Sequence, residues 1–187
     1  LPWTGEYLSQ GKAPMNRRCF VALDLPDKAR EAACGVQRGL RKKFPDLRYT
    51  SRENLHLTLK FLGEISSELL EEAGKRLKAV RGPPLEVSLG PVGAFPPSIV
   101  WLRLRGADDF QRQVDDALAP LFEPETRFMG HVTIARTKGI TDSLRRALEA
   151  RESAELTTSA ASFSLQESCL SHLGPRYDTI GRYQLQG

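Results

Sequence analysis

Hydrophobic and polar residues follow one another along the chain in short segments of two kinds. In some, apolar and polar positions alternate, which is typical of a half-buried strand; in others, apolar residues recur every three to four positions, which is typical of a helix packed on one side. Ser66 is a suitable N-cap for one such helix, and Gly82, Pro83 and Pro84 end it. The first half of the chain thus predicts a strand at 18–25, a helix at 29–40, a strand at 54–62, a helix at 66–81 and a strand at 85–89.

The second half of the chain repeats this order of elements. Two copies of the order predict an α+β fold with two pseudo-symmetric lobes, each an antiparallel sheet flanked by helices, facing each other across a central cleft. We expect residues 17–187 to form this single bilobal domain, and residues 1–16 to be an N-terminal tail, native or left from cloning. The segments of the second half are a strand at 99–104, a helix at 108–122, a strand at 131–134, a helix at 142–150 and strands at 161–165 and 177–185.

The second strand of each copy contains a His-x-Thr motif, His56 with Thr58 and His131 with Thr133. Residues i and i+2 of a strand share a face, so each motif presents an imidazole beside a hydroxyl. A single histidine on a half-buried strand is more often structural. Two of only three histidines with Thr at the second following position would arise by chance about 1% of the time, which favours a functional pair.

Two imidazoles around one centre can divide the work of an in-line displacement at phosphorus. One removes a proton from water and the other donates a proton to the departing oxygen, since both titrate near neutral pH. The threonine hydroxyls can bind the non-bridging phosphate oxygens. A metal site is not predicted, because threonine is a poor zinc ligand and no Cys, His or Asp cluster completes a coordination shell.

Composition adds several constraints to this interpretation. The chain has 187 residues, a net charge of +4 and a pI near 9.1, which favours a phosphate-bearing partner. Its three cysteines lack a CxxC pair, so we expect neither disulfides nor a zinc knuckle, and a reducing, cytoplasmic compartment. No apolar run is long enough for a membrane span, and no phosphate-binding glycine loop is present, so we expect an ATP-independent protein without a cofactor.

Both motifs, with their neighbours in 54–64 and 131–136, resemble the paired signatures of the two-histidine phosphoesterases. The similarity is to the bacterial and archaeal RNA 2',3'-cyclic phosphodiesterases, historically called 2'-5' RNA ligases, and it extends from Arg18 to Leu185. It implies a monomer that hydrolyses the terminal 2',3'-cyclic phosphate of RNA to a 2'-phosphomonoester, with reverse 2'-5' ligation as a further activity. It also implies that His56 is the proton donor to the leaving 3'-oxygen and His131 the proton acceptor. The residues themselves do not distinguish the two imidazoles.

Two other functions remain open at this stage. The same site would suit a phosphodiesterase acting on small cyclic nucleotides, ADP-ribose cyclic phosphate or 2'-5' oligonucleotides. Alternatively, the chain is a non-catalytic RNA- or nucleotide-binding module whose histidines only hold phosphate. Such a module has no need of two titratable groups, and the paired motifs therefore favour the enzyme.

Further candidates for substrate binding are two cations near the motifs. Lys60 shares the face of His56 by alternation, so it either meets RNA phosphates or lies at a solvated rim. Arg136 matches a common position of the resembled family, but alternation places it opposite His131 unless a bulge or a strand end turns it back. Gly130 stands where many members of that family have proline, and its flexibility is expected to loosen the start of the strand.

Three aromatic residues, Phe20, Phe128 and Tyr177, are candidate stacking surfaces for a terminal base. For Phe20 and Phe128 we expect core packing instead. Tyr177 follows a turn and has Arg176 beside it, so it is the stronger candidate for the cleft. His172 lacks the threonine and is expected to be an ordinary loop residue.

Overall fold

The computed structural model describes residues 16–151, 156–171 and 174–186. Within them the chain alternates between strands and helices in the order that the sequence predicts, with three short elements in addition: β2, β7 and a 3-10 turn, η1. The first copy comprises β1 (Arg17–Asp24), α1 (Asp27–Arg41), β2 (Arg48–Tyr49), η1 (Arg52–Asn54), β3 (His56–Ile65), α2 (Ser67–Leu77) and β4 (Leu85–Phe95). The second comprises β5 (Ile99–Arg105), α3 (Asp108–Leu118), β6 (His131–Arg136), α4 (Asp142–Glu149), β7 (Leu156–Ala160), β8 (Ser162–Ser171) and β9 (Gly174–Gln184).

Local sequence signals account for where several helices begin. The Ser66 hydroxyl accepts a hydrogen bond from the Leu69 amide at 3.3 Å and caps α2. The Thr141 hydroxyl does the same for α4, with the Leu144 amide at 3.2 Å. Both α2 and α3 end four residues earlier than predicted, at Leu77 and Leu118, and the residues after each form turns.

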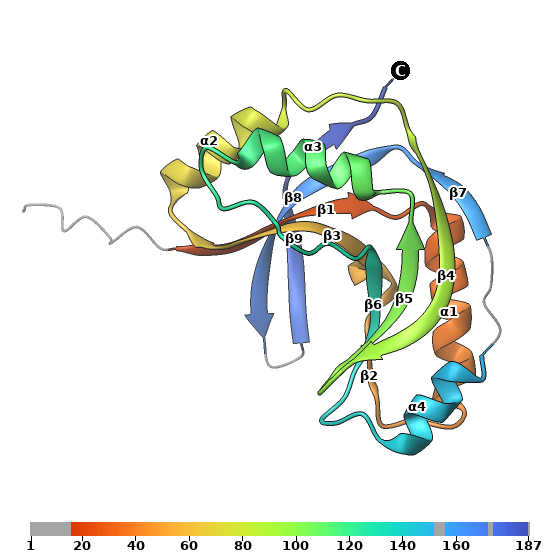
Figure 1. Ribbon diagram of the computed structural model, residues 1–187. Helices are drawn as coiled ribbons and strands as arrows, with labels where there is room; N and C mark the ends of the chain where they lie inside the picture. Colours follow the sequence, from red (N-terminus) through yellow and green to blue (C-terminus); the bar gives the residue numbers. More distant parts are fainter. Residues whose placement is uncertain (1–15, 152–155, 172–173, 187) are drawn as a thin grey trace, which may run out of the picture.

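All strands join one curled, antiparallel sheet in the order β7-β4-β5-β6-β3-β1-β8-β9, with β2 beside β6 (Figure 1). The predicted α+β class is thereby confirmed. The only registered pair between β3 and β6 is Leu57 with Val132, and this pair joins two half-sheets. The first half-sheet consists of β1, β3, β8 and β9, and the second of β4, β5, β6 and β7 with β2.

The half-sheets do not correspond to the two halves of the chain. β8 and β9 come from the C-terminal end yet extend the sheet beyond β1, while β4, from the first copy, pairs with β5 and β7. The helices cross over in the same way, because α1 contacts β6 and β7, whereas α3 contacts α2 and β3. Each lobe is therefore assembled from segments that alternate along the sequence.

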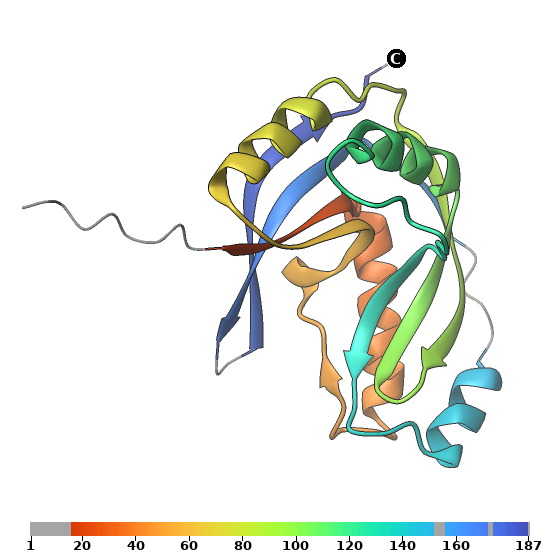
Figure 2. The same ribbon diagram turned by 60° about the vertical axis from the view of Figure 1, so that its left-hand side comes forward.

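The helices lie on the outer side of the curl (Figures 1 and 2), and the core fills the space between them and the sheet. Within the two motifs, every second residue of the central strands points outward into this core. Leu57, Leu59, Val132 and Ile134 are almost wholly inaccessible to solvent. The residues between them point to the inner face of the sheet, where His56, Thr58, His131 and Thr133 are half-buried. The curl thus leaves the inner face of β3 and β6 free of helices.

Candidate active site

The two His-x-Thr motifs meet at the joint between the half-sheets. Because β3 and β6 are antiparallel and Leu57 pairs with Val132, the register continued by one residue places His56 beside Thr133 and Thr58 beside His131. The two motifs are thus related by a pseudo-twofold axis that passes between Leu57 and Val132. Each histidine has a threonine of its own strand and one of the facing strand as neighbours, and a phosphate above this square would meet all four side chains.

Both histidine rings are oriented by the same hydrogen bond. Nδ1 of His56 lies 2.7 Å from the carbonyl oxygen of Asn54, and Nδ1 of His131 lies 2.7 Å from that of Met129. A carbonyl oxygen only accepts, so in each ring Nδ1 carries the proton and donates it. In a neutral ring with Nδ1 protonated, Nε2 has no proton, as a general base requires. The Thr58 hydroxyl lies 3.1 Å from Nε2 of His56.

The segment that precedes His56 is held from two sides. The Asn54 side chain donates a hydrogen bond to the carbonyl oxygen of Pro175 at 2.9 Å, which ties η1 to the beginning of β9. Arg30 of α1 donates to two carbonyl oxygens of η1, at 2.9 and 3.2 Å. Asn54 therefore fixes the ring of His56 through its carbonyl group and the β8–β9 hairpin through its amide. No pattern in the sequence indicated this role of Asn54.

Burial lowers the pKa of His56 to about 4. The hydrogen bond to the Asn54 carbonyl and the charge of Asp24 oppose this shift, while the charges of Arg30 and His131 add to it. His56 is therefore neutral at pH 7 in the free protein. The register of β3 and β6 places the two rings near each other, so a positive charge on His131 lowers the pKa of His56.

Aromatic rings contact both histidines, two at His56 and one at His131 among the described residues. The ring centroid of Phe20 lies 4.9 Å from that of His56, and Tyr177 contacts His56 edge-on at 5.2 Å. Phe20 is nearly wholly buried and also meets Tyr177, at 5.1 Å. On the other side, Phe95 contacts His131 edge-on at 5.1 Å. Tyr177, the stronger candidate for the cleft, thus contacts His56. Phe20, for which core packing was expected, is buried but lies against the His56 ring. Phe95 was missed because it ends a strand that the pattern had stopped at residue 89.

A bulge in β3 changes the face to which Lys60 belongs. Thr58 pairs with Ala22 and Lys60 with Val21, so Leu59 is an extra residue between them. Leu59 and Lys60 both point into the core, and Lys60 is only 3% exposed. The placement of Lys60 beside His56 was therefore wrong, because alternation does not continue through a bulge.

Lys60 instead forms a buried link to the segment around α3. Its ammonium group is ion-paired with Asp115 and donates to the carbonyl oxygen of Glu123 at 2.7 Å. Beyond the bulge the faces are exchanged, so Phe61, which alternation placed in the core, is 65% exposed. The Phe61 ring lies 6.2 Å from that of Phe20 and extends the aromatic cluster around His56.

β6 contains the equivalent bulge, at the equivalent position. Its register against β5 shifts after Thr133, so Ile134 is the extra residue and both Ile134 and Ala135 are buried. Because of this bulge, Arg136 lies on the same face as His131. A bulge was the condition under which the sequence allowed Arg136 a role at the site. Arg136 is exposed, and its positive charge partly offsets the burial that raises the pKa of Tyr177. Arg136 and Tyr177 therefore lie near each other on the inner face.

The other residues singled out from the sequence have structural partners or lie outside the described residues. Phe128 packs against the core, as expected. Gly130 is fixed rather than loose: its carbonyl group accepts from the Leu104 amide at 3.0 Å, and a Cβ here would lie 2.4 Å from the Leu104 oxygen. Arg176 forms an exposed ion pair with Asp178 at 2.7 Å. His172 and the tail at 1–15 lie outside the described residues.

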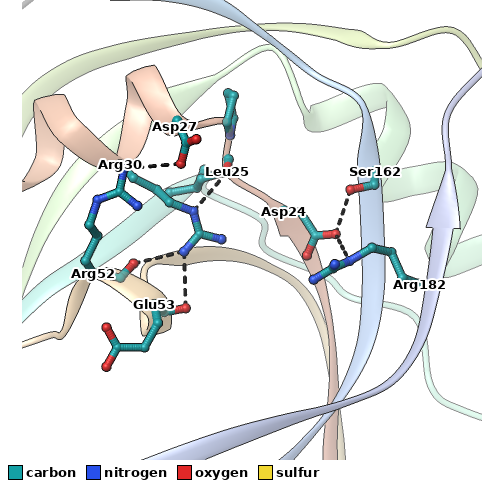
Figure 3. A pocket seen from close by; sticks show the side chains of 9 residues that line it. Asp24, Leu25, Asp27, Arg30, Arg52, Glu53, Ser162 and Arg182 are labelled. Atoms are coloured by element: carbon teal, nitrogen blue, oxygen red, sulfur yellow. Dashed lines mark hydrogen bonds and ion pairs between the residues drawn. The ribbon is translucent and has the colours of Figure 1, made fainter.

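A pocket of about 550 Å³ adjoins the site on the β1 side (Figure 3). Asp24, which pairs with His56 in the sheet, stands at its edge. Its carboxylate accepts hydrogen bonds from Ser162 at 2.7 Å, Ser164 at 2.8 Å and Arg182 at 3.1 Å. Nothing in the sequence pattern indicated this pocket. The residues that line it are Asp24, Leu25, Pro26, Asp27, Arg30, Arg52, Glu53, Ser162 and Arg182.

Two further observations concern the described part of the chain as a whole. Its histidine, cysteine and acidic side chains include no group of three or more that could hold a metal ion. None of its helices is long and apolar enough to cross a membrane.

A curled antiparallel sheet with one His-x-Thr motif on each of its two central strands is the architecture of the two-histidine phosphoesterases. Residues 23–101 match the family model described as LigT-like phosphoesterase. An RNA 2',3'-cyclic phosphodiesterase of Aeropyrum pernix is 33% identical over 141 residues, 68% of this chain and 80% of that protein. One of Archaeoglobus fulgidus is 30% identical over 175 residues, 87% of this chain and 97% of that protein. The chain belongs to the RNA 2',3'-cyclic phosphodiesterase family.

Solved structures show the same fold. TT0787 of Thermus thermophilus superimposes with a TM-score of 0.76 at 25% identity, covering 91% of this chain and 98% of that one. Escherichia coli LigT in complex with 3'-AMP gives a TM-score of 0.73 at 25% identity, covering 92% of this chain and 99% of that one. The similarity thus extends over nearly all of the chain, well beyond the residues of the two motifs.

Proposed function

We propose that this protein hydrolyses the terminal 2',3'-cyclic phosphate of RNA to a 2'-phosphomonoester, with His56 as the proton donor and His131 as the proton acceptor. One observation carries the proposal: two histidines meet at the joint of the half-sheets, each with Nδ1 engaged by a backbone carbonyl and Nε2 left for the reaction. The relatives in Aeropyrum and Archaeoglobus are RNA 2',3'-cyclic phosphodiesterases, which supports this substrate.

The reaction is an in-line displacement at phosphorus. A water molecule gives a proton to Nε2 of His131 as its oxygen bonds to phosphorus. The bond from phosphorus to the 3'-oxygen breaks on the opposite side, and that oxygen takes a proton from Nε2 of His56. Thr58 and Thr133, beside the histidines, donate hydrogen bonds to the non-bridging oxygens, on which charge develops in the transition state.

His56 must gain a proton before it can donate one. In the free protein burial holds its pKa at about 4, but the cyclic phosphate brings a negative charge beside the ring. An adjacent negative charge favours the protonated imidazole and raises its pKa. We infer that His56 takes up its proton as the substrate binds, while the Nδ1 hydrogen bond to Asn54 keeps the ring in place.

The test is turnover of a short RNA that ends in a 2',3'-cyclic phosphate, with EDTA present and ATP absent. Wild type is compared with His56→Ala and His131→Ala, and the position of the phosphate in the product is identified. We expect 2'-phosphate from wild type and a loss of at least about 100-fold in each variant.

Folded wild-type protein that binds the RNA without turnover, with binding retained in both variants, would overturn the catalytic proposal and favour a binding module. Turnover of small cyclic nucleotides or 2'-5' oligonucleotides, but not of the RNA, would instead show that the same site acts on another substrate. The hydrolysis of each of these compounds is measured beside that of the RNA.

The proposed setting is a cytoplasmic monomer. Cys19, Cys34 and Cys169 are free thiols, which agrees with a reducing compartment. All four groups proposed for the chemistry come from one chain, so a second copy is not needed to complete the site. Light scattering of the purified protein tests the monomer, and cell fractionation tests the compartment.

A further inference from the structure

Two buried hydrogen-bond donors on β5 have no acceptor. Among the described residues, three buried side-chain nitrogens lack a hydrogen-bond partner: Nε of Arg76, Nε1 of Trp101 and Nη1 of Arg103. Arg76 has a counter-charge, because its Nε lies 3.2 Å from the carboxylate of Glu72. Trp101 and Arg103 are two residues apart on one strand and therefore share a face of the sheet.

These two residues lie beside the second histidine motif. Trp101 pairs with Thr133 and Arg103 pairs with His131 in the register of β5 and β6. Side chains directly opposite each other in antiparallel strands have Cβ atoms about 5 Å apart. β5 lies next to β6, on the side opposite β3. In the sheet, His131 therefore lies between the strand of the two donors and the strand of His56.

The first half-sheet has the opposite charge at the equivalent position. Asp24 pairs with His56 as Arg103 pairs with His131, and its carboxylate is fully engaged by Ser162, Ser164 and Arg182. Arg103 has no such partner in the part of the chain that the structure describes. A partly buried guanidinium without a counter-charge is costly, and such a group calls for a ligand or another explanation.

We propose that Arg103 and Trp101 form a subsite for an internal phosphodiester of the RNA, separate from the cyclic phosphate between the histidines. The inference rests on the proposed function. A phosphodiester is an anion whose two non-bridging oxygens only accept hydrogen bonds, so one oxygen suits the guanidinium and the other the indole N–H. The cyclic phosphate already has the two histidines and two threonines. A substrate of at least two nucleotides is therefore needed to occupy both sites.

The experiment compares two substrates that differ by one phosphodiester: a 2',3'-cyclic mononucleotide and a dinucleotide with a terminal 2',3'-cyclic phosphate. We expect Arg103→Met to lower kcat/KM about tenfold for the dinucleotide and to leave the mononucleotide unchanged. The dependence of log kcat/KM on log salt for the dinucleotide should become shallower by about 0.7. Arg105→Met is the matched control, because Arg105 lies on the same strand and face but is exposed, and it should change kcat/KM less than about twofold.

Stability separates this role from a structural one. Because Arg103 lacks a partner in the free protein, Arg103→Met should leave Tm unchanged or raise it. Trp101→Phe keeps an aromatic ring and removes the donor, and it should lower kcat/KM on the dinucleotide alone, by less than Arg103→Met does. A fall in Tm of more than about 5 °C in Arg103→Met would show that the guanidinium supports the fold, and would overturn the proposal.

Three kinetic results would also overturn the proposal. In the first, Arg103→Met lowers kcat/KM on neither substrate; in the second, it lowers kcat/KM equally on both, which would place Arg103 at the cyclic phosphate. In the third, Arg105→Met lowers kcat/KM on the dinucleotide as much as Arg103→Met does. If wild type turns over neither substrate, the proposed function fails, but the subsite is still tested by calorimetric binding of the dinucleotide. About tenfold weaker binding to Arg103→Met than to wild type would support the subsite, and equal affinity would overturn it.

Discussion

His56 and His131 share one orienting device but differ in their surroundings. Each donates from Nδ1 to the carbonyl oxygen two residues earlier, at the same distance of 2.7 Å. In the sheet, however, a carboxylate stands beside His56 and a guanidinium beside His131, from Asp24 and Arg103. The repeated strand geometry thus supplies two equivalently oriented rings, and the residues that flank them on the neighbouring strands differ in charge.

The lowered pKa of His56 predicts a loss of stability in acid. The pKa falls from about 6.5 in the unfolded chain to about 4 in the folded one, so the unfolded chain binds more protons between these values. Stability is therefore lost as the pH falls from 6.5 to 4, by at most about 3 kcal/mol. Urea unfolding at pH 7 and pH 5 should show a smaller loss for His56→Gln than for wild type. Equal losses would mean that His56 is not held neutral by the fold.

Asn54 is predicted to position His56 and Tyr177 together. Asn54→Ala removes the hydrogen bond to Pro175 but keeps the carbonyl that orients His56, so kcat/KM should fall about three- to tenfold with the pH profile unchanged. Asn54→Asp has nearly the same shape and no donor, and it should behave like Asn54→Ala in the same assay. Full activity of Asn54→Asp would show that the hydrogen bond to Pro175 does not matter.

At the scale of the element, the two central strands share more than the histidine motif. Each has a bulge directly after its threonine, at Leu59 in β3 and at Ile134 in β6. The residue after each bulge, Lys60 or Ala135, is buried, and the next one faces inward. A bulge is a specific feature of a strand pair, and here it decides which side chains reach the site.

The buried ion pair between β3 and α3 gives a prediction at this scale. Lys60→Met leaves Asp115 buried without its counter-charge and should lower the free energy of unfolding by about 3–5 kcal/mol. Adding Asp115→Asn removes the unpaired charge and keeps an acceptor for the Glu125 amide, so most of the loss should be recovered. Urea unfolding measures both. A stable Lys60→Met variant that loses turnover would contradict this structural role.

At the scale of the whole molecule, the half-sheets interleave. β1 lies between β3 and β8, which are about a hundred residues apart in the sequence, and Phe163 of β8 packs edge-on against Phe110 of α3 at 5.1 Å. Neither copy of the sequence repeat contains all the strands of a half-sheet. The inner face on which the motifs meet therefore exists only when both ends of the chain are in place.

This interleaving predicts that the chain folds as one unit. A fragment of residues 17–95, one complete copy of the repeat, should remain unfolded by circular dichroism, because it lacks the β8 that covers β1 and the β5 that pairs with β4. Residues 17–187 should unfold in a single transition, like the full chain. Cooperative unfolding of the 17–95 fragment would contradict this.

Most of the strands and helices, the two motifs and the family could be predicted from the sequence alone. Strand and helix periodicity is local, so the strands that carry His56 and His131 could be placed from neighbouring residues alone. Two His-x-Thr motifs at matching positions then indicated a phosphate site. The usual burial of phenylalanine also predicted that Phe128 packs against the core, where the structure places it.

Which side chains share the site depends on contacts between strands that local sequence does not contain. The bulges that bury Lys60 and return Arg136 depend on the register of neighbouring strands, which alternation within one strand does not contain. The exchange of strands between the half-sheets, and the unpartnered Arg103 beside His131, likewise arise from contacts between segments distant in sequence. Pairing of that kind is set by the packing of the whole sheet against its helices, because a shift of one residue would turn every side chain to the other face.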